Sequence, residues 1–245
     1  MSIHPVARGF EQAADVYERA RPDYPQAALD WIVDSLALAP GARVVDVGAG
    51  TGKFARQLVA RGLRVTAVEP IAEMRAILER TVPDVDALEG TAEAIPVDDS
   101  FADAVTAAQA FHWFDRRRAL PEMYRVLRGG GGVALIWNVR DESHDIHRAY
   151  AETIRPYRIH EYPEQQDTAG ALRASQLFER VEERTFPHGQ QMTAARLVER
   201  ASSVSFIAQL PAEERAALLE RVRRLAPEGA FDFPYLTKVF TAHRR

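Results

Sequence analysis

The sequence predicts a doubly wound α/β fold, in which helices cover both faces of a parallel sheet. In roughly the first 140 residues, short β-branched and apolar runs alternate with segments of helical periodicity. These runs stay apolar instead of alternating with polar residues, as expected for strands buried on both faces of a parallel sheet. A chain of 245 residues is long enough for one large domain.

Five strands are expected in this first part, in an order that alternates with helices. Their ranges are 43–47, 64–69, 85–89, 102–108 and 133–138. Helical spacing predicts the intervening helices over 53–61, from Ile71 to Leu78, and over roughly 116–127. Gly62 stands where a helix C-cap is expected, and the glycines over 129–132 indicate a turn before the fifth strand.

After Asp141 the pattern changes to helices with few strands. The expected elements are a helix over 146–157, a polar loop over 158–170, a strand over 181–186, helices opened by Thr193 and Pro211, and a last strand over 232–242. We therefore expect one domain in four parts. They are a cap segment over 1–30, a ligand-binding core over 31–141, a helical lid with a sixth strand over 142–230, and a final strand over 231–245.

Composition excludes several classes of protein. The 35 acidic residues outnumber the 31 basic ones, which gives a net charge of -4 and argues against a general nucleic-acid binder. The absence of cysteine excludes disulfides, Cys-ligated metals and cysteine nucleophiles. The N-terminus lacks a signal-peptide pattern, and the apolar runs are too short for a membrane span. We expect a soluble cytoplasmic protein without a membrane partner.

The most informative segment is a glycine-rich loop between the first strand and the following helix. It contains Asp46, Gly48, Gly50 and Gly52 at alternate positions. Glycines allow positive φ and let a ligand approach the backbone. Ligands of open α/β sheets bind beyond the carboxyl ends of the strands, and the second strand ends there in Glu69. A carboxylate at that place can accept hydrogen bonds from both hydroxyls of a ribose.

Three nucleotide-binding patterns compete for this loop. The dinucleotide fingerprint needs glycine where Lys53 or Ala55 stands, and a P-loop fails at Val47 and Phe54. The spacing from Asp46 to Gly52 instead resembles motif I of the class I S-adenosylmethionine-dependent methyltransferases.

The resemblance to these methyltransferases continues along the chain in the expected order. Glu69-Pro70 resembles the acidic motif that holds the cofactor ribose, and 90–96 the motif that flanks adenine. The segment 104–109 resembles the fourth-strand motif, and 125–131 the turn before strand five. Two positions depart from the family pattern. Thr91 stands where an aspartate is common, which puts the adenine contact in doubt, and Gly129 replaces a proline.

A narrower resemblance is to the type 11 small-molecule methyltransferases, near the trans-aconitate methyltransferase-like proteins. The segments 17–25, 109–115 and 136–141 carry this match. It implies a Rossmann-like seven-stranded sheet with the first five strands parallel, an inserted C-terminal helical lid, and an N-terminal segment folded over the cofactor.

The resemblance implies that the cofactor is S-adenosylmethionine, with S-adenosylhomocysteine as the product. The residues expected at the cofactor are Tyr17, Arg21, Asp46, Gly48, Ala49, Gly50, Gly52, Glu69, Pro70, Met74, Thr91, Ala92, Glu93 and Gln109. Asp46 is expected near the cofactor amino group, Met74 near adenine, and Gln109 at the methionine end. Tyr17 and Arg21 would form part of the roof over the cofactor.

The acceptor is expected to be a small molecule, with O-methylation of a small carboxylic acid as the predicted reaction. Its candidate contacts are His112, as substrate contact or base, and Trp113, Trp137, Ser203 and Tyr235. A carboxylate is already ionised and needs no base, whereas a hydroxyl or protonated amine would need one. Arg21 could hold a substrate carboxylate through a bidentate pair.

Other functions stay open as alternatives. An NAD-dependent oxidoreductase and a non-catalytic cofactor-binding regulator are the competing classes. Cytosine-C5 methylation of nucleic acid needs a cysteine, and Gln109-Ala110-Phe111 does not match the motif of adenine-N6 enzymes. His144 and His147 could bind a metal, but a solvated helix face is favoured and no metal site is predicted. The sequence does not indicate an oligomeric state.

Overall fold

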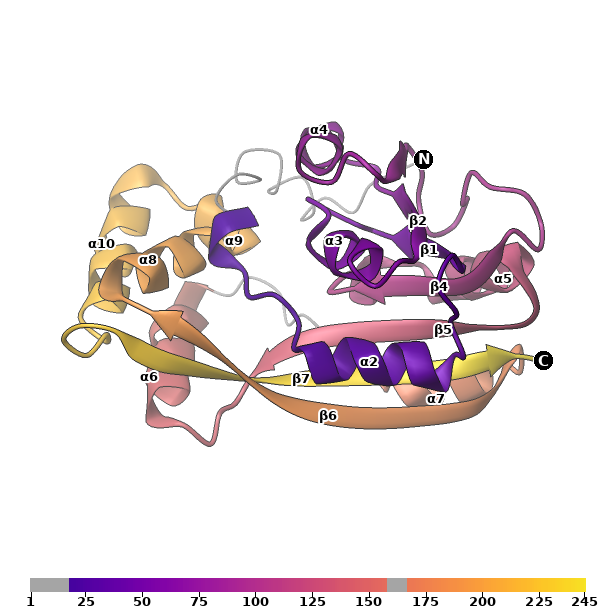
Figure 1. The fold of residues 1–245 in the computed structure, drawn as a ribbon. Helices are drawn as coiled ribbons and strands as arrows, with labels where there is room; N and C mark the ends of the chain where they lie inside the picture. Colours follow the sequence, from indigo (N-terminus) through magenta and orange to yellow (C-terminus); the bar gives the residue numbers. More distant parts are fainter. Residues whose placement is uncertain (1–17, 158–166) are drawn as a thin grey trace. The chain divides into compact units, whose positions relative to one another are not determined.

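The computed structural model describes residues 18–157 and 167–245. Within them, seven strands form one sheet in the order β3-β2-β1-β4-β5-β7-β6 (Figure 1). The strands are β1 (Arg43–Val47), β2 (Arg64–Val68), β3 (Asp86–Leu88), β4 (Ala102–Ala108), β5 (Leu127–Arg140), β6 (Phe178–Met192) and β7 (Phe231–Arg244). The predicted doubly wound α/β fold with a seven-stranded sheet is confirmed.

The first five strands pair in parallel, as their composition predicts. β1 pairs with β2 on one side and β4 on the other, β2 pairs with β3, and β4 pairs with β5. All but the first residue of both β1 and β2 are buried. Burial on both faces explains why these strands read as continuous apolar runs. The arrow of β7 in Figure 1 points opposite to that of β5, so the sheet is mixed.

The described residues form two compact units. The core unit contains residues 23–138, 167–186 and 237–245, and the helical unit contains residues 18–22, 139–157 and 187–236. Helices of the core unit are α2 (Gln26–Ser35), α3 (Lys53–Val59), α4 (Ala72–Thr81), the 3₁₀ turn η2 (Phe111–Trp113), α5 (Arg116–Val126) and α7 (Thr168–Ala174).

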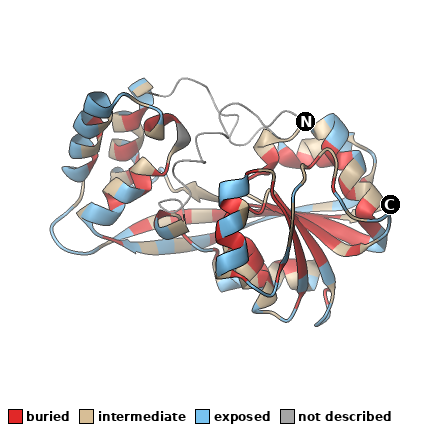
Figure 2. Ribbon diagram, turned by 90° about the horizontal axis from the view of Figure 1, so that it is seen from above, coloured by how far each residue is buried: buried red, intermediate tan, exposed pale blue. Residues whose placement is uncertain are grey.

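One hydrophobic cluster in the core unit joins helices α2 and α3 to the sheet. Leu29 of α2 and Phe54 of α3 pack with Val44 of β1 and Ile136 of β5, all of them almost fully buried. Figure 2 shows buried residues along the strands of the sheet, while the helices carry exposed residues on their outer sides. This packing fixes the loops that follow the strands, because each loop connects a buried strand to a docked helix.

The helical unit has a separate apolar core. Its helices are α6 (Asp145–Ile154), the 3₁₀ turn η3 (Arg155–Tyr157), α8 (Ala194–Ser202), α9 (Ser205–Ala208) and α10 (Ala212–Arg223). Tyr150, Leu197, Leu218 and Phe233 are buried there in one cluster. Within residues 18–157 and 167–245, no helix combines the length and apolar character that crossing a membrane requires.

Two local predictions are wrong. The glycines over 129–132 lie within β5 instead of forming a turn before it. A Cβ on Gly131 would lie 2.7 Å from the Asp103 carbonyl oxygen and one on Gly132 2.5 Å from that of Ala242, so these glycines allow close strand approach. Part of the expected loop is helix α7, because Asp167 caps it by accepting a hydrogen bond from the Gly170 N–H at 2.6 Å.

Candidate functional site

The predicted ligand-binding residues of the core unit follow three neighbouring strands. β1 ends at Val47 and leads into the glycine loop, β2 ends at Val68 before Glu69, and β4 ends at Ala108 before Gln109. β2, β1 and β4 are adjacent and parallel, so these three segments lie at one edge of the sheet. This is the edge at which open α/β sheets bind ligands.

The glycine loop needs residues without a side chain. Gly48, Gly50 and Gly52 have φ of 68°, 59° and 85°, in the left-handed region that glycine adopts without strain. A Cβ on Gly48 would lie 2.7 Å from Cβ of Ala110, so the next loop of the site packs against it. Around Gly50 the nearest atom to such a Cβ would be Sδ of Met74, at 3.8 Å. Among the described residues, nothing therefore crowds this side of Gly50.

Glu69 fastens this loop to the end of β2. Its Oε2 accepts a hydrogen bond from the Gly50 N–H at 2.8 Å, and its Oε1 accepts one from the Ile71 N–H at 2.9 Å. The residue is 4% exposed. Burial raises the pKa of Glu69, and the hydrogen bonds from Ile71 and Gly50 oppose that rise. Each carboxylate oxygen keeps further acceptor capacity for a ligand.

Asp46 is a second buried carboxylate, at the end of β1. Its Oδ1 accepts a hydrogen bond from the Thr106 hydroxyl at 2.7 Å, and its Oδ2 has no partner among the described residues. The pKa of Asp46 is raised to about 7, mainly by burial and to a smaller extent by the charge of Glu69, while the Thr106 bond opposes the rise. A buried acceptor without a partner is costly, and a cationic or N–H group of a ligand would satisfy it.

We expect Asp46 to make the protein less stable as the pH rises from about 4 to 7. In that window the folded state holds a proton that the unfolded state has released, so the free energy of unfolding falls by about 1.4 kcal/mol per pH unit. Asp46→Asn should flatten this part of the profile in urea unfolding between pH 4 and 8. Asp84→Asn, at an exposed position, is the control and should keep the wild-type slope. Equal slopes in all three proteins would show that Asp46 does not cause this pH dependence of stability.

Met74 and Pro70 complete this side of the site. Met74 is buried in α4, and its Sδ is the nearest atom to the open side of Gly50. Pro70 directly follows Glu69 and is partly buried. Arg75, which was not predicted, donates to the Glu69 carbonyl oxygen at 2.8 Å and so helps to hold the end of β2.

The segment expected near adenine follows β3. Thr91 forms an isolated bridge with Ala94, and Ala92 is 2% exposed. The Oε1 of Glu93 accepts a hydrogen bond from the Asp115 N–H at 2.8 Å. This bond joins the segment to the one that follows β4, so the two predicted parts of the site are connected.

Gln109 has an unusual backbone conformation for a non-glycine residue. Its φ is 56°, and its N–H donates to the Ile136 carbonyl oxygen at 2.9 Å. Its side-chain Nε2 donates to the Asn138 carbonyl oxygen at 3.1 Å. Left-handed non-glycine residues held in this way are concentrated at functional sites.

Asn138 organises this end of the site, although it was not among the predicted residues. Besides the bond from Gln109, its Nδ2 donates to the Asp23 carbonyl oxygen at 3.1 Å, and its Oδ1 accepts from the Thr237 hydroxyl at 2.6 Å. The only sequence signal for it is its position at the end of strand five, inside the segment that carries the narrower resemblance.

The aromatic segment after β4 forms the turn η2. His112 and Trp113 are both partly buried, with ring centroids 4.6 Å apart. Trp137 of β5 packs edge-on against Phe111 at 6.4 Å and against Phe240 at 5.7 Å. Its indole Nε1 is buried and has no partner among the described residues. These rings belong to the core unit, together with the glycine loop.

Three other predicted residues belong to the helical unit. Arg21 donates from Nε to the Ser203 hydroxyl at 3.2 Å and from Nη2 to the Ser203 carbonyl oxygen at 3.1 Å. Tyr235 is 1% exposed, and its hydroxyl accepts a hydrogen bond from Nε of Arg200 at 3.3 Å. Tyr17 lies outside the described residues.

The two histidines considered as metal ligands differ in environment. The interpretation as a solvated helix face is wrong for His147, which is fully buried and whose Nε2 bonds to the Pro234 carbonyl oxygen. Burial lowers the pKa of His147 to about 4, so the ring is neutral. In the described part of the chain, no three metal-ligating side chains are grouped around one point.

Comparison with known proteins finds methyltransferases along most of the chain. A family model described as a methyltransferase domain matches residues 45–135. An uncharacterised methyltransferase of Mycobacterium tuberculosis is 39% identical over 239 residues, which cover 95% of this chain and 94% of that protein. A methyltransferase-like protein of Schizosaccharomyces pombe is 34% identical over 215 residues, which cover 86% of this chain and 84% of that protein.

Solved structures share the fold. A type II methyltransferase candidate from Anaeromyxobacter dehalogenans superposes with a TM-score of 0.66 at 22% identity, covering 91% of this chain and 96% of its own. A phosphoethanolamine N-methyltransferase from Haemonchus contortus, solved with S-adenosylhomocysteine, has a TM-score of 0.58 at 18% identity, covering 100% of this chain and 60% of its own.

Proposed function

This chain belongs to the methyltransferases, and we propose that it transfers the methyl group of S-adenosylmethionine to a small carboxylic acid, forming a methyl ester. The observation that carries the cofactor part of this proposal is the carboxylate of Glu69. It is almost fully buried at the carboxyl end of β2 and is bonded to the amide of Gly50 in the glycine loop.

The residues around this carboxylate fit S-adenosylmethionine. The spare acceptor capacity of Glu69 suits the two ribose hydroxyls, and the open side of Gly50 gives a ligand access to the backbone. Asp46 offers the unpartnered Oδ2 to the cationic amino group of the cofactor.

The other cofactor contacts that we propose lie on both sides of this centre. Met74 and the segment of Thr91, Ala92 and Glu93 would contact adenine, and Gln109 the methionine end. The loop residues Gly48, Ala49 and Gly52, with Pro70, would shape the surface under the ribose and methionine. From the resemblance alone, Tyr17, outside the described residues, and Arg21 are further proposed cofactor contacts.

When bound, the cofactor supplies an electrophilic methyl group on a sulfonium, open to in-line displacement. The residues of the chain bind and orient both reactants and exclude water. Orientation alone can contribute about 7–11 kcal/mol to lowering the barrier. Excluding water also strengthens the attraction between a carboxylate and a sulfonium.

We propose His112, Trp113 and Trp137 as acceptor contacts, because they follow or neighbour β4 at the same edge as the glycine loop. Trp113 could face the sulfonium through a cation–π contact. A carboxylate acceptor needs no base, so His112 would then contact substrate without moving a proton. Arg21, Ser203 and Tyr235 remain candidate acceptor contacts from the sequence.

Carboxylate methylation is supported by two relatives that are both malonyl-[acyl-carrier protein] O-methyltransferases. A malonyl-[acyl-carrier protein] O-methyltransferase of Pectobacterium atrosepticum is 34% identical over 130 residues, which cover 53% of this chain and 51% of that protein. The finer resemblance to trans-aconitate methyltransferase-like proteins remains a prediction of the sequence.

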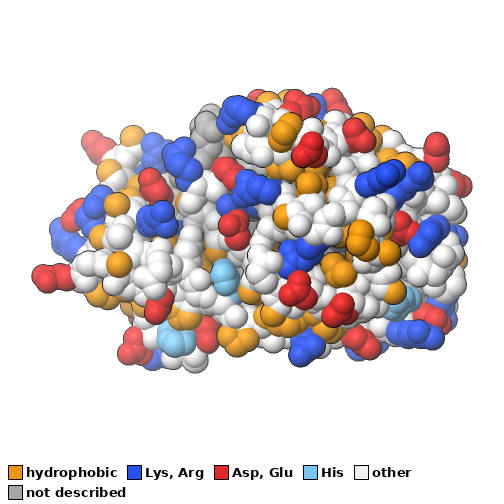
Figure 3. Space-filling model, in the orientation of Figure 1, with side chains coloured by type: hydrophobic (Ala, Val, Ile, Leu, Met, Phe, Trp, Pro, Cys, Tyr) orange, Lys and Arg blue, Asp and Glu red, His pale blue; other side chains and the backbone are white. Residues whose placement is uncertain are grey.

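A small molecule is the proposed acceptor in preference to nucleic acid. The net charge is -4, and the face in Figure 3 shows acidic and basic side chains interspersed. A phosphate-binding surface would concentrate positive charge on one face.

We expect S-adenosylhomocysteine to raise the melting temperature by roughly 5–11 °C when present at 100 times its dissociation constant. Such an excess adds about 2.7 kcal/mol of stability, and a domain of this size gains about 2–4 °C per kcal/mol. The measurement is thermal unfolding, with NADH as the control ligand. A shift with NADH alone would contradict the proposal and support an oxidoreductase.

The acceptor is tested by turnover with candidate small molecules. Partly apolar carboxylic acids should become methyl esters, detected by mass spectrometry, while phenols and amines should not react. Turnover of a phenol or an amine but no carboxylic acid would refute the proposed acceptor class. Cofactor binding without transfer to any acceptor would instead indicate a non-catalytic regulator.

A further inference from the structure

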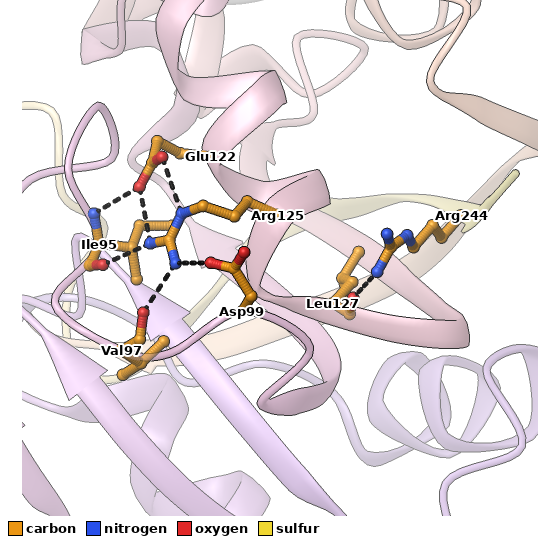
Figure 4. Close-up of polar contacts among 7 residues, drawn as sticks. All are labelled: Ile95, Val97, Asp99, Glu122, Arg125, Leu127 and Arg244. Atoms are coloured by element: carbon orange, nitrogen blue, oxygen red, sulfur yellow. Dashed lines mark hydrogen bonds and ion pairs between the residues drawn. The ribbon is translucent and has the colours of Figure 1, made fainter.

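Arg125, at the end of α5, uses all five of its N–H donors on neighbouring groups (Figure 4). Its Nε donates to Oε1 of Glu122 at 3.0 Å, and its Nη2 to Oε2 of Glu122 at 2.9 Å. Nη2 also donates to the Ile95 carbonyl oxygen at 2.8 Å. Nη1 donates to the Val97 carbonyl oxygen at 2.9 Å and to Oδ1 of Asp99 at 2.7 Å.

The partners of Arg125 come from one loop, residues 95–100, and from its own helix. Glu122 completes the arrangement, because its Oε2 also accepts the Ile95 N–H at 3.1 Å. The Ser100 N–H donates to the Arg125 carbonyl oxygen at 2.9 Å. The loop is thus held to the last turns of α5 through its backbone at several points, which fixes its path.

This loop is the direct continuation of the segment proposed to contact adenine. A Cβ on Gly90 would lie 2.7 Å from Cδ of Pro96 and 2.9 Å from Cγ1 of Val68. The start of the segment therefore packs between the loop that Arg125 holds and the end of β2. Because Glu69 directly follows Val68, a shift of the loop would be transmitted to the site over a few packed atoms.

We propose that Arg125 is a positioning residue for cofactor binding, which holds residues 95–100 and thereby fixes Thr91, Ala92 and Glu93 against adenine. The inference rests on the function proposed above. In this role Arg125 acts through the loop and does not itself contact the cofactor. A lysine could make at most three of the five bonds, from a point charge without the planar fork.

The test compares Arg125→Gln and Arg125→Lys with a matched control, Arg61→Gln. Arg61 also makes several hydrogen bonds in the core unit. Its Nε and Nη2 donate to Oδ1 of Asp30, and its Nη2 also to the Gln26 carbonyl oxygen. It lies between α3 and the start of β2, away from the carboxyl ends of the strands. Loss of either arginine removes comparable bonding from the fold.

We expect Arg125→Gln to bind S-adenosylhomocysteine about 2- to 30-fold more weakly in calorimetric titration, the range typical of residues that act through others. Binding of adenosine should weaken by the same factor, because adenosine carries the adenine base that the shifted segment would contact. Hydrogen exchange over residues 91–97 should speed up. Arg125→Lys should recover part of the affinity, and Arg61→Gln should bind like wild type.

Three results would overturn the inference, and they are distinguishable. If the wild-type protein binds S-adenosylhomocysteine and Arg125→Gln binds it with the same affinity, the role of Arg125 is overturned and the proposed function stays intact. Failure of the wild-type chain to bind S-adenosylhomocysteine would overturn both. Equal loss of affinity in Arg61→Gln would show that general loosening of the fold is the cause, which also overturns the role of Arg125.

Discussion

Replacing Gly50 with valine should abolish detectable binding of S-adenosylhomocysteine while the protein remains folded. Gly50 has φ of 59°, where a β-branched residue is a strained outlier that costs about 1–2 kcal/mol or more. The nearest described atom to an added Cβ is Sδ of Met74 at 3.8 Å, so a longer side chain would extend into the place proposed for the ligand. The N–H of Gly50 also bonds to Glu69, and a displaced backbone would break that bond.

Gly41→Val is the matched control for this substitution. Gly41 has φ of 83°, and an added Cβ would meet no heavy atom of the described residues within 4 Å. It therefore carries the same kind of backbone strain in open space, before the amino end of β1. We expect both variants to lose stability in urea unfolding and only Gly50→Val to lose binding in calorimetric titration. A folded Gly50→Val protein with wild-type affinity would refute the placement of the cofactor.

Glu69→Ala should weaken binding of S-adenosylhomocysteine by about 1.5–3 kcal/mol, or roughly 10- to 150-fold. The substitution removes the proposed ribose acceptor. It also leaves the amides of Gly50 and Ile71 without their acceptor, so the loop loses the bonds that shape it. Glu69→Gln keeps a carbonyl oxygen for one of these amides, so its affinity should lie between those of wild type and Glu69→Ala.

Glu89→Ala is the control for Glu69→Ala. Both carboxylate residues are neighbours of Arg75, which donates to the Glu69 carbonyl oxygen and pairs with Oε2 of Glu89 at 3.3 Å. The Glu89 side chain is 78% exposed, so its removal should leave the dissociation constant unchanged. An unchanged dissociation constant in Glu69→Ala itself would remove Glu69 from the site.

The sequence predicts the parallel part of the sheet well, because burial on both faces leaves a strong apolar pattern. β1 has the predicted bounds, and β2 and β4 differ from them by at most one residue. β6 extends over Phe178–Met192, well beyond the predicted 181–186. Most of its residues are exposed or partly buried, so the apolar signal that marks a strand is weak there.

The site could be predicted as far as local spacing determines it. The glycine loop, Glu69 and Gln109 follow strand ends, and strand ends can be read from the chain. Asn138 and Arg125 act through partners distant in sequence, such as Thr237 and Ile95. Such contacts depend on tertiary packing, so no local pattern indicates them.

The bond between Glu69 and the amide of Gly50 has a kinetic consequence for the proposed enzyme. This bond shapes the loop, and the contacts proposed there involve ribose, adenine and the amino acid end. The spent cofactor keeps all of those groups and lacks only the methyl group. On the proposed function, S-adenosylhomocysteine should therefore bind through the same contacts as S-adenosylmethionine and inhibit turnover as it accumulates.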